Sequence, residues 1–295
     1  MISRNHQVIL FNIKKTDHKK NESDSKLVSV ENNNCLSCCF CNKLAQQKNT
    51  TMNLANNTIL ITGGASGIGL ALAERFLAAG SKVIVCGRSA EKLHEAKSKF
   101  PQLITKQCDV STPAERIELL NWVKTAIPNL NILINNAGIQ RRVNFKENQD
   151  DWSEFQKEIA INLEAPIHLS HLFIPHLLQQ RDPYIVNVGS GLAFVPAAFV
   201  PVYSATKAAL HSFTLSLRHQ LSSTTIKVVE IIPPAVDTDL GGPGLHTFGV
   251  PLQDFADAIM LGMSAGKKEV AYGTAESRLQ VGKGELDEIF KMMNK

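Results

Sequence analysis

Continuous apolar runs alternate with amphipathic segments along the chain from residue 52 onward. The apolar runs predict β-strands near residues 58–62, 82–86, 103–108, 131–135, 184–189, 226–231 and 268–272. Apolar residues at helical spacing predict helices near 67–79, 89–99, 113–126, 151–179, 203–222, 251–264 and 275–293. Buried Val/Ile/Leu strands separated by helices are typical of a parallel sheet covered on both faces. The pattern therefore predicts one doubly wound α/β domain with a seven-stranded parallel sheet.

Residues 1–51 differ from the rest of the chain in composition. They are rich in Asn, Lys and Ser without periodicity, so we expect a disordered extension ahead of a single domain at 52–295. The extension holds eight Lys/Arg against four Asp/Glu, whereas the remainder holds 23 of each. The net charge of +4 therefore belongs to the extension. A neutral domain lacks the basic surface that binding to nucleic acid requires.

The six cysteines are unevenly distributed. Four lie within residues 35–41 of the extension, whereas Cys86 and Cys108 lie in strand-like runs and are expected to be buried thiols. Cys35 and Cys38 have the two-residue gap of a zinc knuckle, but no second pair or Cys/His partner follows at finger spacing. This favours an unstructured leader over a metal site, and we expect no bound metal.

The apolar runs are short. None approaches the about 18 residues that a membrane span needs. The first apolar run, Val8 to Phe11, is too short for the apolar region of a secretory signal. We therefore expect a cytoplasmic protein without a membrane span.

A glycine-rich loop follows the first predicted strand and opens the next helix. It consists of Thr62-Gly63-Gly64-Ala65-Ser66-Gly67-Ile68-Gly69. Glycines let the chain turn tightly and bring backbone N–H groups against a pyrophosphate, while the helix N-terminus adds partial positive charge. No Gly-Lys-Ser/Thr follows, so the loop is not a P-loop. The loop predicts a dinucleotide site.

The end of the second strand bears on the choice of dinucleotide. An NAD site usually places Asp or Glu about 20 residues beyond the loop, whereas a nearby Arg accommodates a 2′-phosphate. Here the chain reads Gly87-Arg88-Ser89, with no carboxylate and with two donor side chains. We expect NADP(H) to be favoured over NAD(H), with a solvated surface charge as the alternative interpretation of Arg88.

Three further features follow strand ends. Asn135-Asn136-Ala137-Gly138 comes after the fourth strand, Ser190 after the fifth, and Tyr203-Ser204-Ala205-Thr206-Lys207 opens a long helix. Tyr203 and Lys207 are four apart, so they project from one helix face. Ligands of open parallel sheets bind beyond the carboxyl ends of the strands. These side chains are therefore expected to converge beside the glycine loop.

In this order and spacing, the T-G-x-x-x-G-x-G loop, N-N-A-G, Ser190 and Y-x-x-x-K resemble the motifs of the short-chain dehydrogenase/reductase (SDR) family across residues 55–295. The segment 233–240 is also similar to the DltE-like branch of bacterial SDR oxidoreductases, with Pro234 where most relatives have Gly. The resemblance implies a Rossmann fold, a nicotinamide cofactor, and interconversion of a carbonyl and a secondary alcohol by hydride transfer.

The resemblance also implies roles for single residues. Tyr203 would be the acid/base, with its pKa of about 10 lowered by Lys207. Ser190 would hold the carbonyl oxygen, and Asn162 would link Lys207 to a water that relays protons; bonding of Asn162 to a neighbouring loop is the alternative. Asn136 is equally well interpreted as structural. The implied cofactor contacts are Thr62, Gly63, Ser66, Gly67, Ile68, Gly69, Arg88, Ser89, Asp109, Val110, Asn136, Ala137, Gly138, Tyr203, Lys207, Pro233, Val236 and Thr238.

The substrate side is less clearly marked. We expect a lid over a small or medium organic substrate, formed by Gly241, Gly242, Pro243, Gly244, His246 and Phe248, and a pocket lined by Phe194, Gln140 and Arg141. Family members are commonly homodimers or homotetramers built on helices that correspond to 151–179 and 203–222. Two rivals remain: a regulatory protein that binds a dinucleotide without catalysis, and an S-adenosylmethionine methyltransferase, which Tyr203-x-x-x-Lys207 disfavours.

Overall fold

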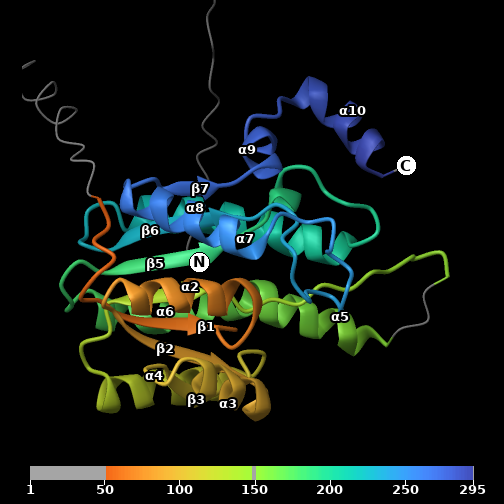
Figure 1. Ribbon diagram of the computed structural model, residues 1–295. Helices are drawn as coiled ribbons and strands as arrows, with labels where there is room; N and C mark the ends of the chain where they lie inside the picture. The colour runs from red at the N-terminus through yellow and green to blue at the C-terminus, as the bar shows by residue number, and fades with distance from the viewer. Residues whose placement is uncertain (1–50, 148–150, 295) are drawn as a thin grey trace, which may run out of the picture. The chain divides into compact units, whose positions relative to one another are not determined.

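The computed structural model of the protein describes residues 51–147 and 151–294. Within them, seven parallel strands form one sheet in the order β3-β2-β1-β4-β5-β6-β7 (Figure 1). The strands are β1 (Thr58–Thr62), β2 (Lys82–Gly87), β3 (Ile104–Gln107), β4 (Ile132–Asn135), β5 (Tyr184–Val188), β6 (Lys227–Ile232) and β7 (Glu269–Ala271). The predicted seven-stranded parallel sheet is confirmed. The extension and its four cysteines lie outside the described residues except for Thr51, so its predicted disorder stays a prediction.

The helices connect the strands in the alternating order that the sequence predicts. They are α2 (Gly67–Ala78), α3 (Ala90–Lys99), α4 (Pro113–Ala126), α5 (Trp152–Ile159), α6 (Ala165–Leu177), α7 (Pro201–Gln220), α8 (Leu252–Ser264), α9 (Thr274–Arg278) and α10 (Lys283–Met293). A 3₁₀ turn, η2 (Gly191–Ala193), follows β5. No helix in the described ranges has the length and apolar character that a membrane span requires.

Two predicted helices are interrupted in the structure. The segment predicted as one helix at 151–179 is divided by a π-helical turn, η1 (Ala160–Glu164), between α5 and α6. Pro166 lacks the N–H that would bond the Asn162 carbonyl in an α-helix, which explains a break at this place. The predicted last helix divides into α9 and α10, because Gly282 adopts an extended backbone at the start of α10.

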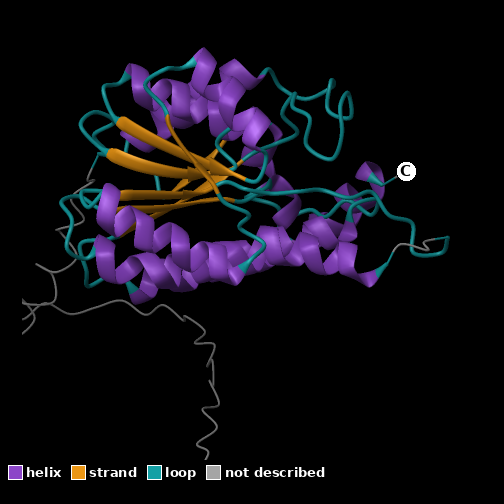
Figure 2. Cartoon of the chain, turned by 90° about the horizontal axis from the view of Figure 1, so that it is seen from below, coloured by secondary structure: helices purple, strands orange, loops and turns teal. Residues whose placement is uncertain are grey.

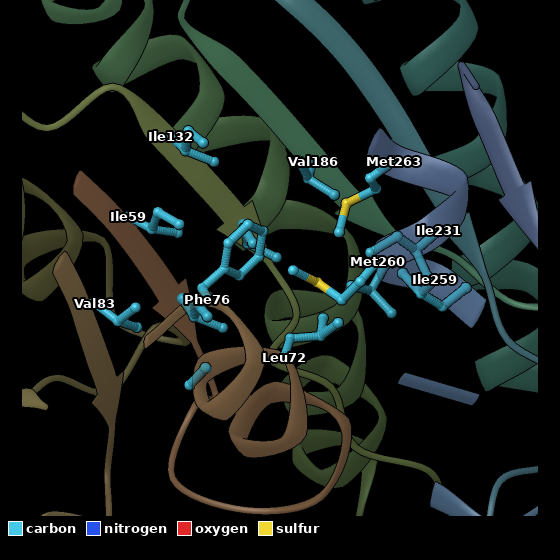
Figure 3. Close-up of a cluster of buried hydrophobic side chains, with 14 of the residues drawn as sticks. Ile59, Leu72, Phe76, Val83, Ile132, Val186, Ile231, Ile259, Met260 and Met263 are labelled. Atoms are coloured by element: carbon cyan, nitrogen blue, oxygen red, sulfur yellow. The ribbon is translucent and has the colours of Figure 1, made fainter. Parts of the chain in front are cut away.

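Alternate residues of the central strands serve two hydrophobic cores. Ile59 and Ile61 of β1 pack with α2, α3 and α8, whereas Leu60 packs with α4, α6 and α7. Figure 2 shows helices on both sides of the sheet. Figure 3 shows the first core, where Phe76 of α2 lies among side chains of the sheet and of α8. Burial on both faces explains why the central strands are apolar throughout.

The strand order reverses between β1 and β4. The chain runs outward from β1 through β2 to β3 and then returns to place β4 on the other side of β1. The connections that leave β1 and β4 therefore diverge and open a crevice at the carboxyl end of the sheet. The glycine loop follows β1, and Asn136 to Gly138 follow β4, so both motifs lie at this crevice.

Candidate active site

A cavity of about 1160 Å³ opens at the carboxyl ends of the strands. Its size exceeds the about 300–1,000 Å³ typical of small-ligand pockets, which suits a dinucleotide together with a substrate. Most of the predicted cofactor residues line it: Gly63, Ser66, Gly67, Ile68, Arg88, Ser89, Asp109, Val110, Asn136, Ala137, Gly138, Tyr203, Lys207, Pro233, Val236 and Thr238. Ser190 lines it too. The structure therefore brings residues from six strand ends to one cavity.

Thr62, Gly69 and Asn136 connect the two loops at the crevice. The Thr62 hydroxyl accepts the backbone N–H groups of Asn136 at 3.0 Å and Ala137 at 3.1 Å. The Asn136 side chain in turn donates to the carbonyls of Thr62 and Gly63. A Cβ at Gly69 would lie 2.5 Å from Asn136 Nδ2 and from the Gly63 oxygen. Thr62 and Gly69 do not line the cavity; they hold the loops that do.

The glycine loop needs its glycines for conformation as well as for space. Gly63 and Gly67 have φ angles of 62° and 51°, in the left-handed region that favours glycine. A Cβ at Gly63 would approach the Ala137 Cα to 2.8 Å. Ser66 precedes α2 as its N-cap in an extended conformation, and its side chain makes no capping hydrogen bond. The first N–H groups of α2 thus face a cavity that fits a phosphate group.

The end of the cavity beside β2 and β3 carries two cations. Arg88 and Lys92 both line it, while a Cβ at Gly87 would meet no atom within 4 Å. Ser89 accepts the Lys92 N–H and caps α3. Burial acts to raise the pKa of Asp109, but hydrogen bonds from Ser111 and the charge of Arg88 outweigh it and lower the pKa. Sequence reasoning missed Lys92, although its place three residues after Ser89 on a predicted helix start was a usable signal.

Tyr203, Ser190 and Lys207 lie together at the other end of the cavity. All three are buried, and Tyr203 and Lys207 project from the first turns of α7, which Pro201 opens. The Lys207 ammonium donates to the Val188 carbonyl at 2.7 Å and lies 5.6 Å from the centroid of the Tyr203 ring. The Ser190 hydroxyl accepts the Leu192 N–H at 3.1 Å. A phenol, an ammonium and a hydroxyl thus share one wall.

Burial governs the ionisation of this group. It raises the pKa of Tyr203 to about 12, opposed by hydrogen bonding with Ser190 and assisted by the negative charge of Glu158. Burial lowers the pKa of Lys207 to about 8, opposed by the negative charge of Glu230. The pKa of Tyr203 is therefore raised here, whereas sequence reasoning expected Lys207 to lower it. Desolvation of the phenol is the largest cause of the raised pKa and exceeds the opposing effect of the hydrogen bond with Ser190.

Asn162 lies behind the cavity wall instead of lining it. Its amide accepts the Ile139 N–H at 2.9 Å and donates to the Ile139 carbonyl at 2.8 Å. It also donates to Thr206 on α7 at 3.3 Å. The side chain therefore ties the π-helical turn η1 to the loop after β4, which agrees with the alternative interpretation of this residue.

Two buried carboxylates near the group escaped sequence reasoning. Glu230 on β6 accepts His211 Nδ1 at 2.8 Å, and this bond raises the pKa of His211. Glu158 on α5 is fully buried, and burial raises its pKa to about 7 against the backbone N–H and charge of Arg141. Acidic residues on strands and helices are usually exposed, so nothing in the local pattern marked them.

The structure divides the predicted substrate residues. Gln140, Gly241, His246 and Phe248 line the cavity, whereas Gly242, Pro243 and Gly244 do not. Phe194 packs against His211 at 4.6 Å between ring centroids, and Arg141 pairs with Glu154 at 2.6 Å. The predictions for these two residues were wrong, because each side chain is directed to a partner away from the cavity. Residues that sequence reasoning missed line this end instead: Arg142, Leu192, Ala197, Phe199, Thr274, Arg278 and Met293.

Potential metal ligands are scattered in the described part of the chain. Within residues 51–147 and 151–294, no group of three or more His, Cys, Asp or Glu side chains is arranged to hold a metal ion. Cys86 and Cys108 are both buried free thiols, as predicted.

Comparisons with known proteins agree with this geometry. Residues 57–245 match the family model for short-chain dehydrogenases. An uncharacterised oxidoreductase of Bacillus subtilis, DltE, is 46% identical over 248 residues, which cover 82% of this chain and 98% of the relative. A short-chain dehydrogenase from Burkholderia cenocepacia, solved in complex with NADP, has the same fold with a TM-score of 0.72 at 23% identity, over 83% of this chain and 100% of that one. A short-chain dehydrogenase/reductase from Burkholderia phymatum, solved in complex with NAD, has the same fold with a TM-score of 0.68 at 19% identity. The match covers 81% of this chain and 96% of that one. The chain therefore belongs to the short-chain dehydrogenase/reductase family of NAD(P)-dependent oxidoreductases and is similar to its DltE-like members.

Proposed function

We propose that this protein is an NADP(H)-preferring oxidoreductase that interconverts a carbonyl and a secondary alcohol on a small or medium organic substrate, with Tyr203 as acid/base. One observation carries the proposal. Tyr203, Lys207 and Ser190 line the same cavity as the glycine loop, although they come from segments up to about 140 residues away. A site that only binds a dinucleotide needs no such group.

A nicotinamide cofactor, when bound, supplies or accepts the hydride. During carbonyl reduction the substrate oxygen gains negative charge, and the Ser190 hydroxyl is placed to hydrogen-bond it. Tyr203, whose pKa is raised to about 12, is protonated at neutral pH and remains a stronger acid than water, whose pKa is about 15.7. It can therefore deliver its proton to the developing alkoxide.

Lys207 supports this proton transfer from one turn further along α7. With a pKa of about 8, it is largely protonated at pH 7. Its ammonium stabilises the phenolate that Tyr203 becomes after donating its proton. The hydrogen bond to Val188 fixes the position of the ammonium at the end of β5. Asn162 supports the site as a positioning residue through Ile139 and Thr206.

The residues of the cavity fit a dinucleotide. The glycine loop would hold the pyrophosphate against the start of α2, Asp109 and Val110 would border the adenine, and Asn136 to Gly138 with Pro233, Val236 and Thr238 would border the nicotinamide half. Arg88 and Lys92 favour a 2′-phosphate, and Gly87 presents no carboxylate to repel it. Structural neighbours bind either NADP or NAD, so this local charge is what supports NADP(H).

For the assembly we propose the homodimer or homotetramer expected from the sequence. Exposed apolar side chains on the helices that we expect at the interface support a homodimer or homotetramer; they are Trp152, Ile167, Leu178 and Leu215. The cytoplasmic location stays a prediction from the sequence.

The experiment that tests the function is a panel of carbonyl and alcohol compounds followed by NADPH and NADH absorbance, with Tyr203→Phe beside the parent protein. Loss of the proton donor is expected to lower kcat about 10²- to 10⁴-fold. Thermal stabilisation by NADPH is expected to persist, because Phe preserves the shape of the ring.

Two results would contradict the proposal. Equal turnover by Tyr203→Phe and parent would remove Tyr203 from the chemistry. Cofactor binding with no turnover of any compound would favour the regulatory alternative, and stabilisation by S-adenosylmethionine in place of NADPH would favour a methyltransferase.

A further inference from the structure

Arg278 lies in the wall of the cavity at the substrate end. It is the last residue of α9, a short helix that follows the final strand. α9 lies against η2, the turn that begins directly after Ser190. Arg278 is partly buried and lines the same cavity as Ser190 and Tyr203. The C-terminal part of the chain thereby places a cation beside the reacting group.

This guanidinium has no acidic partner among the residues that the structure describes. Its side-chain hydrogen bond in that part of the chain runs from Nη2 to the Met293 sulfur at 3.2 Å. A thioether is a weak acceptor, and a guanidinium carries five N–H donors. Burial lowers the pKa of Arg278, and the group stays charged at neutral pH. A partly buried cation with unused donors in a cavity is suited to a carboxylate or phosphate.

Gly191 fixes how close Arg278 comes to the reacting group. A Cβ at Gly191 would lie 3.2 Å from both Cδ and Nη1 of Arg278, so the guanidinium packs against the backbone of this glycine. Gly191 is the residue after Ser190, and successive Cα atoms are about 3.8 Å apart. A group bound by Arg278 would therefore lie only a few bonds from a carbonyl held by Ser190.

The other charged groups of the cavity differ from Arg278. Arg142 is exposed, and its guanidinium stacks over the Phe199 ring at 4.9 Å. Asp237 and Asp239 line the cavity from the loop after β6, and the Arg278 guanidinium bonds the Met293 sulfur instead of either carboxylate. Arg88 and Lys92 lie at the cofactor end beside β2. Lys207 is the other cation beside Ser190, and its ammonium is bound to the Val188 carbonyl and assigned to the Tyr203 proton transfer. Arg278 is thus the cation outside the reacting group that is best placed for an anion on the substrate.

We propose that Arg278 binds an anionic group of the substrate, a carboxylate one to three bonds from the reacting carbonyl, so that the substrates are oxo acids and the corresponding hydroxy acids. This inference rests on the proposed function, because it takes Ser190 and Tyr203 as the carbonyl site. It assigns specificity to a residue that belongs to no motif of the glycine loop or of the Tyr203 helix.

The test compares acids with their neutral esters. Pyruvate, acetoacetate and levulinate, each beside its methyl ester, are measured as substrates with NADPH and as stabilisers of the NADP⁺ complex in thermal unfolding. For the best acid, the parent protein is expected to favour acid over ester by at least about tenfold in kcat/KM, the range of a charge-assisted hydrogen bond. In Arg278→Met this ratio is expected to fall to about one.

Arg181→Met is the matched control, because Arg181 is 97% exposed and lies in the turn before β5. It is expected to keep the acid-to-ester ratio of the parent. Esters equal to acids in the parent protein, or an unchanged ratio in Arg278→Met, would overturn the inference while leaving the proposed function intact. If an acid stabilised the parent protein but not Arg278→Met, and no compound were turned over, the anion site would be supported and the proposed reaction would be contradicted.

Discussion

The two ends of the cavity are built from different parts of the chain. At the cofactor end, the glycine loop, the Arg88 turn and the loop after β4 each follow a strand directly, and hydrogen bonds to backbone groups hold the first and the third of them. At the substrate end, side chains from loops and short helices meet: Gln140, Arg142, Leu192, Ala197, Phe199, Leu240, His246, Phe248, Thr274, Arg278 and Met293. The shape of the cofactor end depends on close approach between loop backbones, and the shape of the substrate end depends on side chains that can change conformation.

This difference separates binding of a common cofactor from choice of a substrate. Thr62, Asn136 and Gly69 lock two strand ends together, so the cofactor end has little freedom to change shape. Met293 and Arg278 belong to segments outside the sheet, and Phe248 lies between β6 and α8, near a single β-bridge of Val236 with Val250. Recognition residues on loops carried by a rigid scaffold can vary without loss of the fold.

After loss of the Tyr203 hydroxyl, the next largest effect is expected at Lys207. Lys207→Met removes the cation that we propose stabilises the Tyr203 phenolate, so kcat is expected to fall about 10²-fold or more. Stability should move in the other direction. With a folded pKa of about 8 against 10.5, burying the charged lysine costs about 3 kcal/mol below pH 8. Loss of the bond to Val188 offsets about 1–2 kcal/mol of that, leaving a net gain of about 1–2 kcal/mol.

The stability gained by Lys207→Met depends on pH between about 8 and 10.5. Between pH 8 and 10.5 the unfolded chain binds the lysine proton more tightly than the folded one, so the parent gains stability as pH rises. The advantage of Lys207→Met in urea unfolding should therefore shrink across this window. Lys227→Met, at a lysine that is 30% exposed, is the control. An advantage that grew with pH would show that burial does not penalise the charge of Lys207.

The sequence was informative where function depends on local pattern. The apolar runs located the seven strands within a residue or two, and the motifs after β1, β4 and β5 identified most of the cofactor end. The substrate end was less predictable, because Arg278 and Met293 reach the cavity only through the packing of α9 and α10. Phe194 and Arg141 lie within two residues of cavity residues in sequence, yet their side chains are directed to His211 and Glu154. Direction of a loop side chain depends on partners that no local pattern shows.

Replacing one glycine at each end of the cavity by alanine compares the rigidity of the two ends. At Gly69 the new Cβ would lie 2.5 Å from a backbone oxygen and from an amide that is itself bonded twice. Gly69→Ala is expected to lower the free energy of unfolding by about 1–3 kcal/mol and to weaken NADPH binding. At Gly191 the nearest atoms belong to the flexible Arg278 side chain at 3.2 Å, so the cost there should stay below about 1 kcal/mol.

Chemical unfolding and NADPH titration of both variants provide the measurement. Gly87→Ala is the control, because Gly87 has no positive φ and a Cβ there would meet no atom within 4 Å. Gly80→Ala is not suitable, because the φ of 86° at Gly80 would strain alanine. Equal losses of unfolding free energy in Gly69→Ala and Gly191→Ala would mean that the substrate end is as rigid as the cofactor end.

The smallest change concerns which dinucleotide the cofactor end prefers. Gly87→Asp adds a carboxylate at the end of β2, where a Cβ would meet no atom within 4 Å. The new charge should repel a 2′-phosphate, offset the attraction of Arg88 and Lys92, and accept a hydrogen bond from a 2′-hydroxyl. We expect kcat/KM to fall about tenfold with NADPH and to change less than about threefold with NADH, a difference of about 1 kcal/mol. Gly87→Ala should keep the parent preference, since it adds volume without charge. If Gly87→Asp lowered kcat/KM equally with NADPH and NADH, the shape of this turn and not its charge would determine the cofactor preference.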